Sequence, residues 1–343
     1  MPAPSVRSRE IRLVARPSGQ PGPEHFASVL AEVPAPAEDQ ILVRNTWMSV
    51  DPYMRGRMND VPSYIPPFEL DAALEGSAVG TVVASRSAAI PVGATVSHFL
   101  GWREYALLDA GAATVVDTQL APAGAYLGPL GTTGLSAYAA LTRTAPVRAG
   151  ETVFISAAAG AVGSVAGQLA RKLGAARVIG SAGGPDKTRK LVEAFGFDAA
   201  IDYRQGDLAG QLAKQAPDGI DVYLDSVAGD HLVAALDAMR LDGRIAMVGA
   251  ISTYNATAPM PGPHNLFRSA ARQVTLRGML VNHHLDLFPE WVETAARWLA
   301  DGSLRTESTV VDGLERAPEA FLGVLQGANT GKMLVRLVDR EAR

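Results

Sequence analysis

The sequence of 343 residues contains no cysteine. Disulfide bonds, cysteine nucleophiles and zinc sites with cysteine ligands are therefore excluded. The six histidines are scattered along the chain, and we predict no metal site. There is also little excess charge of either sign, because 31 lysines and arginines stand against 35 aspartates and glutamates. Without a basic surplus, no nucleic acid partner is expected.

Long apolar runs are missing as well. The uncharged stretches 118–142 and 152–170 are interrupted by glycine, proline, serine or threonine. We interpret them as packed loop and helix, not as membrane spans. The N-terminal residues Met1–Arg7 lack the apolar core of a signal peptide. We therefore expect a cytoplasmic protein with no membrane partner.

The length suggests two domains, and the pattern of predicted secondary structure changes near residue 127. In residues 1–126, short strand-like runs alternate with turns rich in proline and glycine, which favours a β-barrel-like domain. We expect residues 311–343 to complete this domain. The predicted elements are strands Glu10–Ala15, Gln40–Asn45, Ser77–Ala84, Ala94–Phe99 and Arg103–Leu108, then helix Glu315–Leu325 and strand Lys332–Val338.

Residues 127–310 form the second predicted domain. From residue 151 onward strands and helices alternate, which indicates an α/β fold with a doubly wound parallel sheet. After an initial strand and helix, the predicted elements are strand Ala176–Ser181, helix Asp186–Phe195, strand Ala199–Tyr203, helix Asp207–Gln215, strand Ile220–Asp225, helix Asp230–Arg240, strand Arg244–Gly249, strand Val274–Val281 and helix Phe288–Ala300.

The first strand of this second domain runs into a glycine turn. Thr152–Ser156 is β-branched and aromatic, and Ala157–Gly163 leads from it into a helical pattern. Gly160 and Gly163 lack a Cβ, so the backbone can turn sharply and approach a pyrophosphate, while Gly167 would let the helix lie close on the strand. The helix N-terminus would then face the phosphates. We predict dinucleotide binding here; a plain glycine turn is the alternative.

The end of the second strand indicates which dinucleotide binds. An acidic side chain there usually holds a free ribose diol, but this chain has the small residues Ser181–Gly184 instead. They leave room for a 2′-phosphate. We predict NADP(H), with donors supplied by Lys187, Arg189 or Lys190 and by the phenol of Tyr203. In the alternative interpretation, these basic residues form a solvated helix face.

Further cofactor contacts are expected at the carboxyl ends of later strands, where ligands of open α/β sheets bind. This rule selects Asp225–Val227, Val248–Tyr254 and Met279–Asn282 as walls for the ribose and nicotinamide. Small residues in the second of these segments permit close backbone approach, and its three hydroxyl side chains offer hydrogen bonds. The alternative is that they are ordinary polar loop residues.

Five segments resemble one group of zinc-free medium-chain dehydrogenases/reductases. The group contains leukotriene B4 12-hydroxydehydrogenase/prostaglandin reductase, plant double-bond reductases and bacterial curcumin reductase, and the likeness spans nearly the whole chain. The segments are Ser49–Met58, Gly160–Ser164, Gly196–Asp198, Gly249–Asn255 and Gly327–Lys332.

The resemblance implies a GroES-like first domain, a Rossmann second domain and a homodimer. It also implies the residues that contact NADP(H). These are Gly160, Ala161, Val162, Gly163, Lys187, Tyr203, Ser226, Val248, Gly249, Ala250, Ile251, Ser252, Thr253, Tyr254, Met279, Leu280, Val281 and Asn329.

The chain departs from the group at two positions. Ser226 stands where the family often has asparagine, which shortens one cofactor contact. The active-site tyrosine that several relatives carry before the strand at 274 is absent, with Ala271 near that position. The catalytic residue therefore cannot simply be carried over from the family.

The absence of cysteine ligands shapes the predicted reaction. Oxidation of an alcohol through an alkoxide is difficult without a Lewis acid, whereas hydride addition to an enone produces an enolate, a weaker base that a hydrogen bond can stabilise. We predict NADPH-dependent reduction of the C=C bond of a small α,β-unsaturated ketone or aldehyde. Tyr53 is the first candidate for the hydrogen-bond donor, Tyr254 the second and the ribose hydroxyl of the cofactor the third, with solvent protonating the α-carbon.

Other interpretations of the sequence stay open. Tyr53 could merely pack under its loop with its hydroxyl bonded locally. The same scaffold could reduce quinones, and a protein that binds NADPH without turnover could serve as a redox sensor. Comparing the turnover of a quinone with that of an alkenal distinguishes quinone reduction from enone reduction. Binding of NADPH without turnover of any substrate would indicate a sensor.

Overall fold

The structure is a computed structural model that describes residues 5–337. The predicted strand end at Val338, and Met1–Pro4 of the N-terminal segment, lie outside the described residues. The chain divides into two compact units, one of Met1–Leu127 with Ser308–Arg343 and one of Gly128–Glu307. None of the described helices is both long and apolar enough to cross a membrane.

The first unit is built mainly from antiparallel strands. β1 (Val6–Leu13) and β2 (Phe26–Val33) pair as a hairpin. A seven-stranded sheet runs in the order β14-β15-β3-β4-β5-β7, with β6 paired to β3. Its strands are β3 (Gln40–Ser49), β4 (Ala78–Ser85), β5 (Thr95–His98), β6 (Tyr105–Asp109), β7 (Thr114–Val115), β14 (Ser308–Asp312) and β15 (Lys332–Arg336). The unit also contains the short helix α1 (Met54–Arg57) and the helix α9 (Ala317–Leu325).

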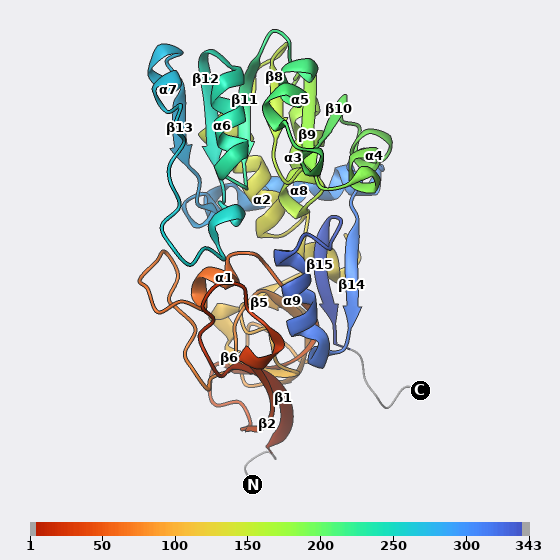
Figure 1. Ribbon diagram of the computed structural model, residues 1–343. Coiled ribbons are helices and arrows are strands. Elements are labelled where there is room, and N and C mark those ends of the chain that lie inside the picture. The colour runs from red at the N-terminus through yellow and green to blue at the C-terminus, as the bar shows by residue number, and fades with distance from the viewer. Residues whose placement is uncertain (1–4, 338–343) are drawn as a thin grey trace. The chain divides into compact units, whose positions relative to one another are not determined.

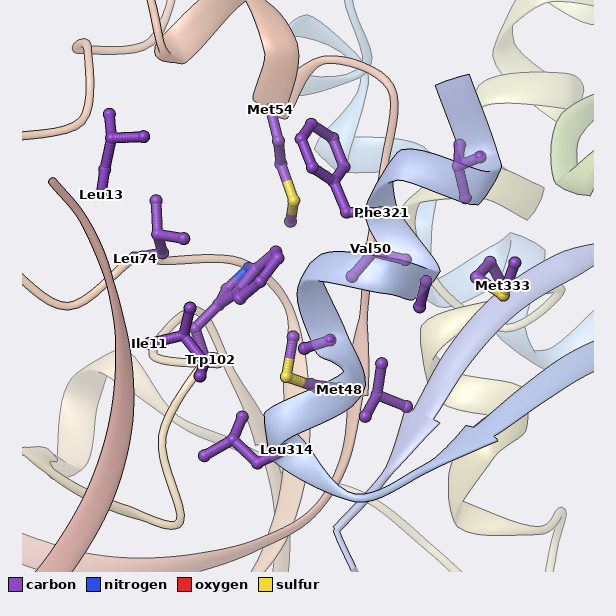
Figure 2. Packing of buried hydrophobic residues seen from close by; sticks show 14 of the residues in the cluster. Ile11, Leu13, Met48, Val50, Met54, Leu74, Trp102, Leu314, Phe321 and Met333 are labelled. Carbon is purple, nitrogen blue, oxygen red and sulfur yellow. The ribbon is translucent and has the colours of Figure 1, made fainter. Parts of the chain in front are cut away.

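The core of this unit surrounds a buried tryptophan, Trp102. Figure 2 shows Trp102 with Met48 and Ile11 beside it. Phe321 of α9 meets the indole ring edge-on at 6.2 Å between ring centroids. Met54 of α1 packs in the same cluster. The short helix that follows Tyr53 is therefore fixed by the core of its own unit.

The second unit contains a six-stranded parallel sheet, which confirms the predicted α/β fold. The strand order is β10-β9-β8-β11-β12-β13, so the chain starts in the middle, builds outward to one edge and then returns to build the other (Figure 1). The order reverses between β8 and β11, and the carboxyl ends of strands at such a point are where α/β sheets bind ligands. The strands are β8 (Thr152–Ile155), β9 (Arg177–Ala182), β10 (Ala199–Asp202), β11 (Ile220–Asp225), β12 (Met239–Met247) and β13 (Thr275–Gly278).

Helices cover both faces of this sheet. α5 (Leu208–Gln215) and α6 (Gly229–Ala238) lie together and pack on one face through Leu212 and Leu236 (Figure 1). α3 (Ala161–Lys172) and α4 (Pro185–Glu193) lie on the other face, because Gly180 of β9 points toward Leu191 of α4 while its neighbour Ile179 belongs to the cluster under α5 and α6. The remaining helices are α2 (Thr132–Ala139), α7 (Phe267–Ala271) and α8 (Phe288–Ala300).

Several predicted boundaries were wrong. Strands β2, β7 and β14 were not predicted. β12 begins at Met239, five residues before the predicted start at Arg244, and its pairing with β11 is irregular over these residues. β10 ends at Asp202, so Tyr203 lies in a 3-10 turn and not at the strand end. The shifted bounds of β12 and β10 arise because a bulge and a cap, not side-chain hydrophobicity, set the ends of these two strands.

Two segments of the first unit that lie far apart in the sequence meet through a buried ion pair. Lys332 begins β15, and its Nζ contacts the carboxylate of Asp51, which also accepts a hydrogen bond from Ser49. The Lys332 side chain is only 4% exposed and that of Asp51 14%. Because β15 also pairs with the end of β3, the chain just before Tyr53 is held by both backbone and charge.

We expect Lys332→Met to lower the free energy of unfolding by about 3–5 kcal/mol, because it leaves the Asp51 carboxylate buried without its cation. Urea unfolding of the variant measures this loss. Asp51→Asn in the same chain should restore part of it. Lys214→Met, at an exposed position on α5, serves as the control and should change stability by less than about 0.5 kcal/mol. A Lys332→Met protein as stable as the parent would contradict a structural role for the pair.

Candidate cofactor and active site

The glycine turn follows β8 as predicted from the sequence. Ala157 has a left-handed backbone, with φ 46°, and the N–H of Gly160 donates to its carbonyl at 2.9 Å. The N–H of Ala158 donates to the carbonyl of Ser181, also at 2.9 Å, which ties the turn to the end of β9. A Cβ added at Gly163 would lie 2.6 Å from the carbonyl oxygen of Ala157. The turn therefore requires glycine at 163 for steric reasons.

The turn leaves the start of α3 open. Gly160 is the N-cap residue and provides no side chain to bond the first N–H groups, which have no partner within a helix. Ala161, Val162 and Gly163 form the first helical residues, so their amides face outward at the positive end of the helix. This is the arrangement that binds a pyrophosphate, and the residues present fit one.

Gly167 packs against an aromatic ring. A Cβ there would lie 2.0 Å from the ring of Phe197, in the segment between α4 and β10. Gly180 of β9 faces the same ring. The absence of side chains at these two glycines makes room for an aromatic ring beside α3 and β9, which lie close together.

The carboxylate of Asp225 organises the next turn, at the end of β11. The residue is completely buried. Its Oδ1 accepts hydrogen bonds from the hydroxyls of Tyr223 (2.8 Å) and Ser156 (3.1 Å) and from the N–H groups of Val227 and Ala228 (2.8 Å each). This single oxygen holds the turn in place and links it to β8. Ser226, a predicted cofactor contact, therefore lies beside the glycine turn, and its N–H donates to Ser156 Oγ at 2.9 Å.

The predicted segment 248–254 lies against this same turn. Val248 and Gly249 donate their N–H groups to the carbonyl of Asp225, and Ile251 donates to that of Ser226. The hydroxyl of Ser252 donates to the carbonyl of Val227 at 2.5 Å.

The remaining hydroxyls of this segment are also bonded locally. Thr253 Oγ1 donates to the carbonyl of Ala250 at 2.8 Å, and the phenol oxygen of Tyr254 accepts from the Ala250 N–H at 3.4 Å. The structure thus brings Gly160–Gly163, Ser226 and Val248–Tyr254 to one edge of the sheet.

A second cluster lies at the ends of β9 and β10. Ser181 Oγ is 2.9 Å from His231 Nε2, and the His231 ring meets that of Tyr203 edge-on at 5.5 Å between centroids. The Tyr203 hydroxyl comes within 2.8 Å of a Cβ built on Gly183. The pKa of Lys187 is lowered by burial and by the positive charges of Arg204 and Lys190.

The other two cations predicted on α4 are engaged elsewhere. Lys190 forms an ion pair with Glu307. Arg189 contacts Asp186 at 2.7 Å and Glu193 at 4.0 Å. Arg204, which the sequence interpretation passed over, lies beside Gly183 instead. Its position directly after Tyr203 was the only signal in the sequence.

Three further predicted contacts belong to the edge of the parallel sheet. The N–H of Met279 donates to the carbonyl of Met247 at 2.8 Å, which extends the pairing of β12 and β13. Leu280 has an extended backbone, and Val281 starts a 3-10 turn. Among residues 5–337, no group of three or more histidine, aspartate or glutamate side chains is arranged to hold a metal ion.

Tyr53 and Asn329 lie in the first unit. Asn329 donates its side-chain amide to the carbonyl of Gly331 at 2.7 Å. The hydroxyl of Tyr53 is buried and has no hydrogen-bond partner among residues 5–337. Burial, and next the neighbouring Asp51 carboxylate, raise the pKa of Tyr53 well above its usual value. The phenol is therefore a neutral donor whose proton no other group in the described chain accepts.

We expect Gly163→Ala to weaken both the fold and cofactor binding. Its methyl group would meet backbone atoms of Ala157 and Ala158, and such overpacking costs about 1–3 kcal/mol. Thermal unfolding and fluorescence titration with NADPH measure the two effects. Gly262→Ala is the control, because nothing lies within 4 Å of its added Cβ. Equal behaviour of the two variants would show that the turn tolerates a side chain.

Comparisons with known proteins agree with this architecture. A family model described as the N-terminal domain of oxidoreductase matches residues 9–116, and one described as zinc-binding dehydrogenase matches residues 161–301. The chain is 36% identical to NADPH-dependent curcumin reductase of Escherichia coli, over 96% of this chain and 97% of that protein. It is 37% identical to 2-alkenal reductase (NADP(+)-dependent) of Nicotiana tabacum, over 92% and 91%.

A solved structure shows the same fold throughout. CurA from Vibrio vulnificus in complex with NADPH superposes with a TM-score of 0.92 at 36% identity, covering 96% of this chain and 99% of that one. Prostaglandin reductase 1 of Mus musculus is 34% identical over 96% of this chain and 99% of its own length. The chain therefore belongs to the medium-chain dehydrogenase/reductase group that contains curcumin reductase, 2-alkenal reductase and prostaglandin reductase.

Proposed function

We propose that this protein uses NADPH to reduce the C=C bond of small α,β-unsaturated ketones or aldehydes. The observation that carries the proposal is the open start of α3 after a turn that requires Gly163. It lies at the sheet's reversal point, where a dinucleotide binds. The named activities of two relatives, curcumin reductase and 2-alkenal reductase, support this reaction class.

Different residues are proposed to contact the pyrophosphate, the 2′-phosphate and the nicotinamide of the cofactor. The amides of Ala161–Gly163 take the pyrophosphate, Lys187 and Tyr203 take the adenosine 2′-phosphate, and the segments around Ser226 and Val248–Tyr254 line the nicotinamide side. Met279–Val281 and Asn329 complete the proposed set. The bound cofactor supplies the hydride, and the protein supplies position and electrostatics.

Tyr53 is the proposed donor to the substrate carbonyl. Hydride addition at the β-carbon leaves negative charge on the carbonyl oxygen, and a hydrogen bond aimed at that oxygen stabilises the enolate. A buried hydroxyl without a partner costs about 1–3 kcal/mol, which supports a functional reason for retaining it. Tyr254 is the second candidate, but its oxygen already accepts from the Ala250 N–H. Solvent then protonates the α-carbon.

Turnover is tested by NADPH oxidation with a panel of alkenals, enones and quinones. We expect turnover with the first two classes and the saturated carbonyl compound as product, identified by mass spectrometry. Faster turnover of quinones than of every enone would favour the quinone reductase alternative. Tight NADPH binding with no turnover across the whole panel would favour the sensor alternative and contradict the proposal.

In the same assay, Tyr53→Phe should lower kcat by about 10²-fold, the effect of removing one donor to a developing oxyanion. The KM for NADPH should stay unchanged. Because its pKa is raised, Tyr53 remains protonated at neutral pH, and its titration should not limit activity there. Tyr64→Phe, at a phenol that is 56% exposed, is the control. Unchanged kcat in Tyr53→Phe removes this residue from the mechanism.

We also propose a homodimer formed through β13. All four residues of this edge strand are exposed. Large apolar side chains lie around it, with Leu276 43%, Leu266 54% and Phe267 82% exposed. An uncovered edge with apolar neighbours favours pairing with another chain, and a second copy can pair the same edge across a twofold axis.

The dimer proposal is tested by analytical ultracentrifugation. The parent protein should have about twice the 35.9 kDa mass of the chain. Leu276→Lys should shift it toward the monomer by placing a charge at the interface. Leu30→Lys, at a 54% exposed position on β2, should not. A monomeric parent protein would contradict the proposal.

The domain roles and the location of the protein are proposals of the same kind. Residues 127–310 form the cofactor domain, and residues 1–126 completed by 311–343 form the substrate domain. The protein acts in the cytoplasm on a small molecule. Cell fractionation tests the location, and the expected result is recovery in the cytosolic fraction.

A further inference from the structure

One basic side chain at the end of β10 has no part in the contacts proposed so far. A Cβ built on Gly183 would lie 2.8 Å from Arg204 Nε and 2.8 Å from the Tyr203 hydroxyl. A Cβ on Gly184 would lie 3.7 Å from Arg204 Nη1. The guanidinium and the phenol therefore lie next to each other against the backbone of Gly183, which is possible because residue 183 has no side chain.

The backbone of Arg204 is tied to this volume by Asp202. One carboxylate oxygen of Asp202 accepts hydrogen bonds from the N–H of Gly184 at 2.8 Å and the N–H of Arg204 at 3.1 Å. The other oxygen accepts from Gln205 at 3.3 Å. Desolvation opposes ionisation of Asp202, but these bonds outweigh it and lower its pKa. The carboxylate fixes the end of β9 to the turn that carries Arg204.

The positive charge of Arg204 acts on the neighbouring Asp202 carboxylate, whose pKa it helps to lower. Lys190 and Arg189 form ion pairs with carboxylates. None of the ion pairs found among residues 5–337 involves the side chain of Arg204. Lys187 lies close enough to Arg204 for each charge to affect the other. Two neighbouring cations beside a phenol form a site that favours an anion carrying more than one charge.

We propose that Arg204 binds the 2′-phosphate of NADP(H) and is a determinant of the preference for this cofactor over NAD(H). The inference rests on the proposed placement of that phosphate beside Lys187 and Tyr203. A guanidinium offers two parallel N–H donors to a phosphate, which an ammonium does not. NAD(H) carries a ribose hydroxyl at the same position, so it gains little from the guanidinium, and the contact discriminates between the two cofactors.

Two fragments of the cofactor separate this contact from the rest of the site. Adenosine 2′,5′-bisphosphate carries the 2′-phosphate and 5′-AMP lacks it, and isothermal titration measures their binding to the full chain without any turnover. In Arg204→Gln we expect the Kd for the bisphosphate to rise about tenfold, as for an exposed charge-assisted hydrogen bond. The Kd for 5′-AMP should change by less than about twofold. NADPH and NADH should show the same pattern.

Two further variants show whether a change in Kd reflects the Arg204 contact itself. Arg189→Gln removes the same charge from α4, where Arg189 is already paired with Asp186, and should leave the Kd ratio of the two fragments unchanged. An equal effect of both variants would indicate a general loss of positive charge and overturn the inference. If Lys187→Gln abolishes the discrimination while Arg204→Gln does not, the phosphate lies where proposed but Arg204 does not bind it. If neither variant alters it, the placement of the phosphate is wrong as well.

Discussion

The buried carboxylate of Asp225 is the interaction on which the cofactor edge depends. One of its oxygens accepts four hydrogen bonds, from the side chains of Tyr223 and Ser156 and from the backbone of Val227 and Ala228. These bonds join the ends of β8 and β11, the two strands between which the sheet reverses its order. Ala228 has φ 62° and ψ −150°, a conformation that alanine rarely adopts and that costs about 1–3 kcal/mol. The carboxylate compensates this strain by bonding the strained turn directly.

The first unit uses the same physical device at a different place. There the pair of Asp51 and Lys332 joins the chain before Tyr53 to the start of β15. Paired, hydrogen-bonded charges are tolerated in a protein interior because each neutralises the desolvation cost of the other. In both units a buried carboxylate fixes the chain next to a proposed functional group, the glycine turn in one and the Tyr53 hydroxyl in the other.

The sequence predicted the parts of the fold that hydrophobic periodicity encodes. β11 and α8 were predicted with the bounds they have, since apolar spacing and flanking turns agree there. β2 was missed because it pairs in a half-exposed hairpin, where polar and small residues alternate with apolar ones.

Within the candidate site, the sequence predicted types of contact better than particular side chains. The glycine turn followed from its position between a strand-like run and a helical pattern, together with the small size of its residues. The three cations on α4 looked equivalent in sequence, yet the structure pairs Lys190 with Glu307, which is more than a hundred residues away. Such choices depend on tertiary distances that no local pattern records. The unpartnered state of the Tyr53 hydroxyl is likewise visible only once its surroundings are known.

The position of Asp202 is consistent with a sheet of the dinucleotide-binding type that accepts a phosphorylated cofactor. In dinucleotide folds an acidic residue about 20 positions past the glycines holds the ribose diol. Here the nearest carboxylate in the cluster is Asp202, at the end of the third strand along the chain, and its oxygens are occupied by the N–H groups of Gly184 and Arg204 and by Gln205. Repulsion between this carboxylate and a 2′-phosphate is reduced because these donors neutralise part of its charge. In the proposed site the carboxylate positions Arg204 instead of competing for the ribose.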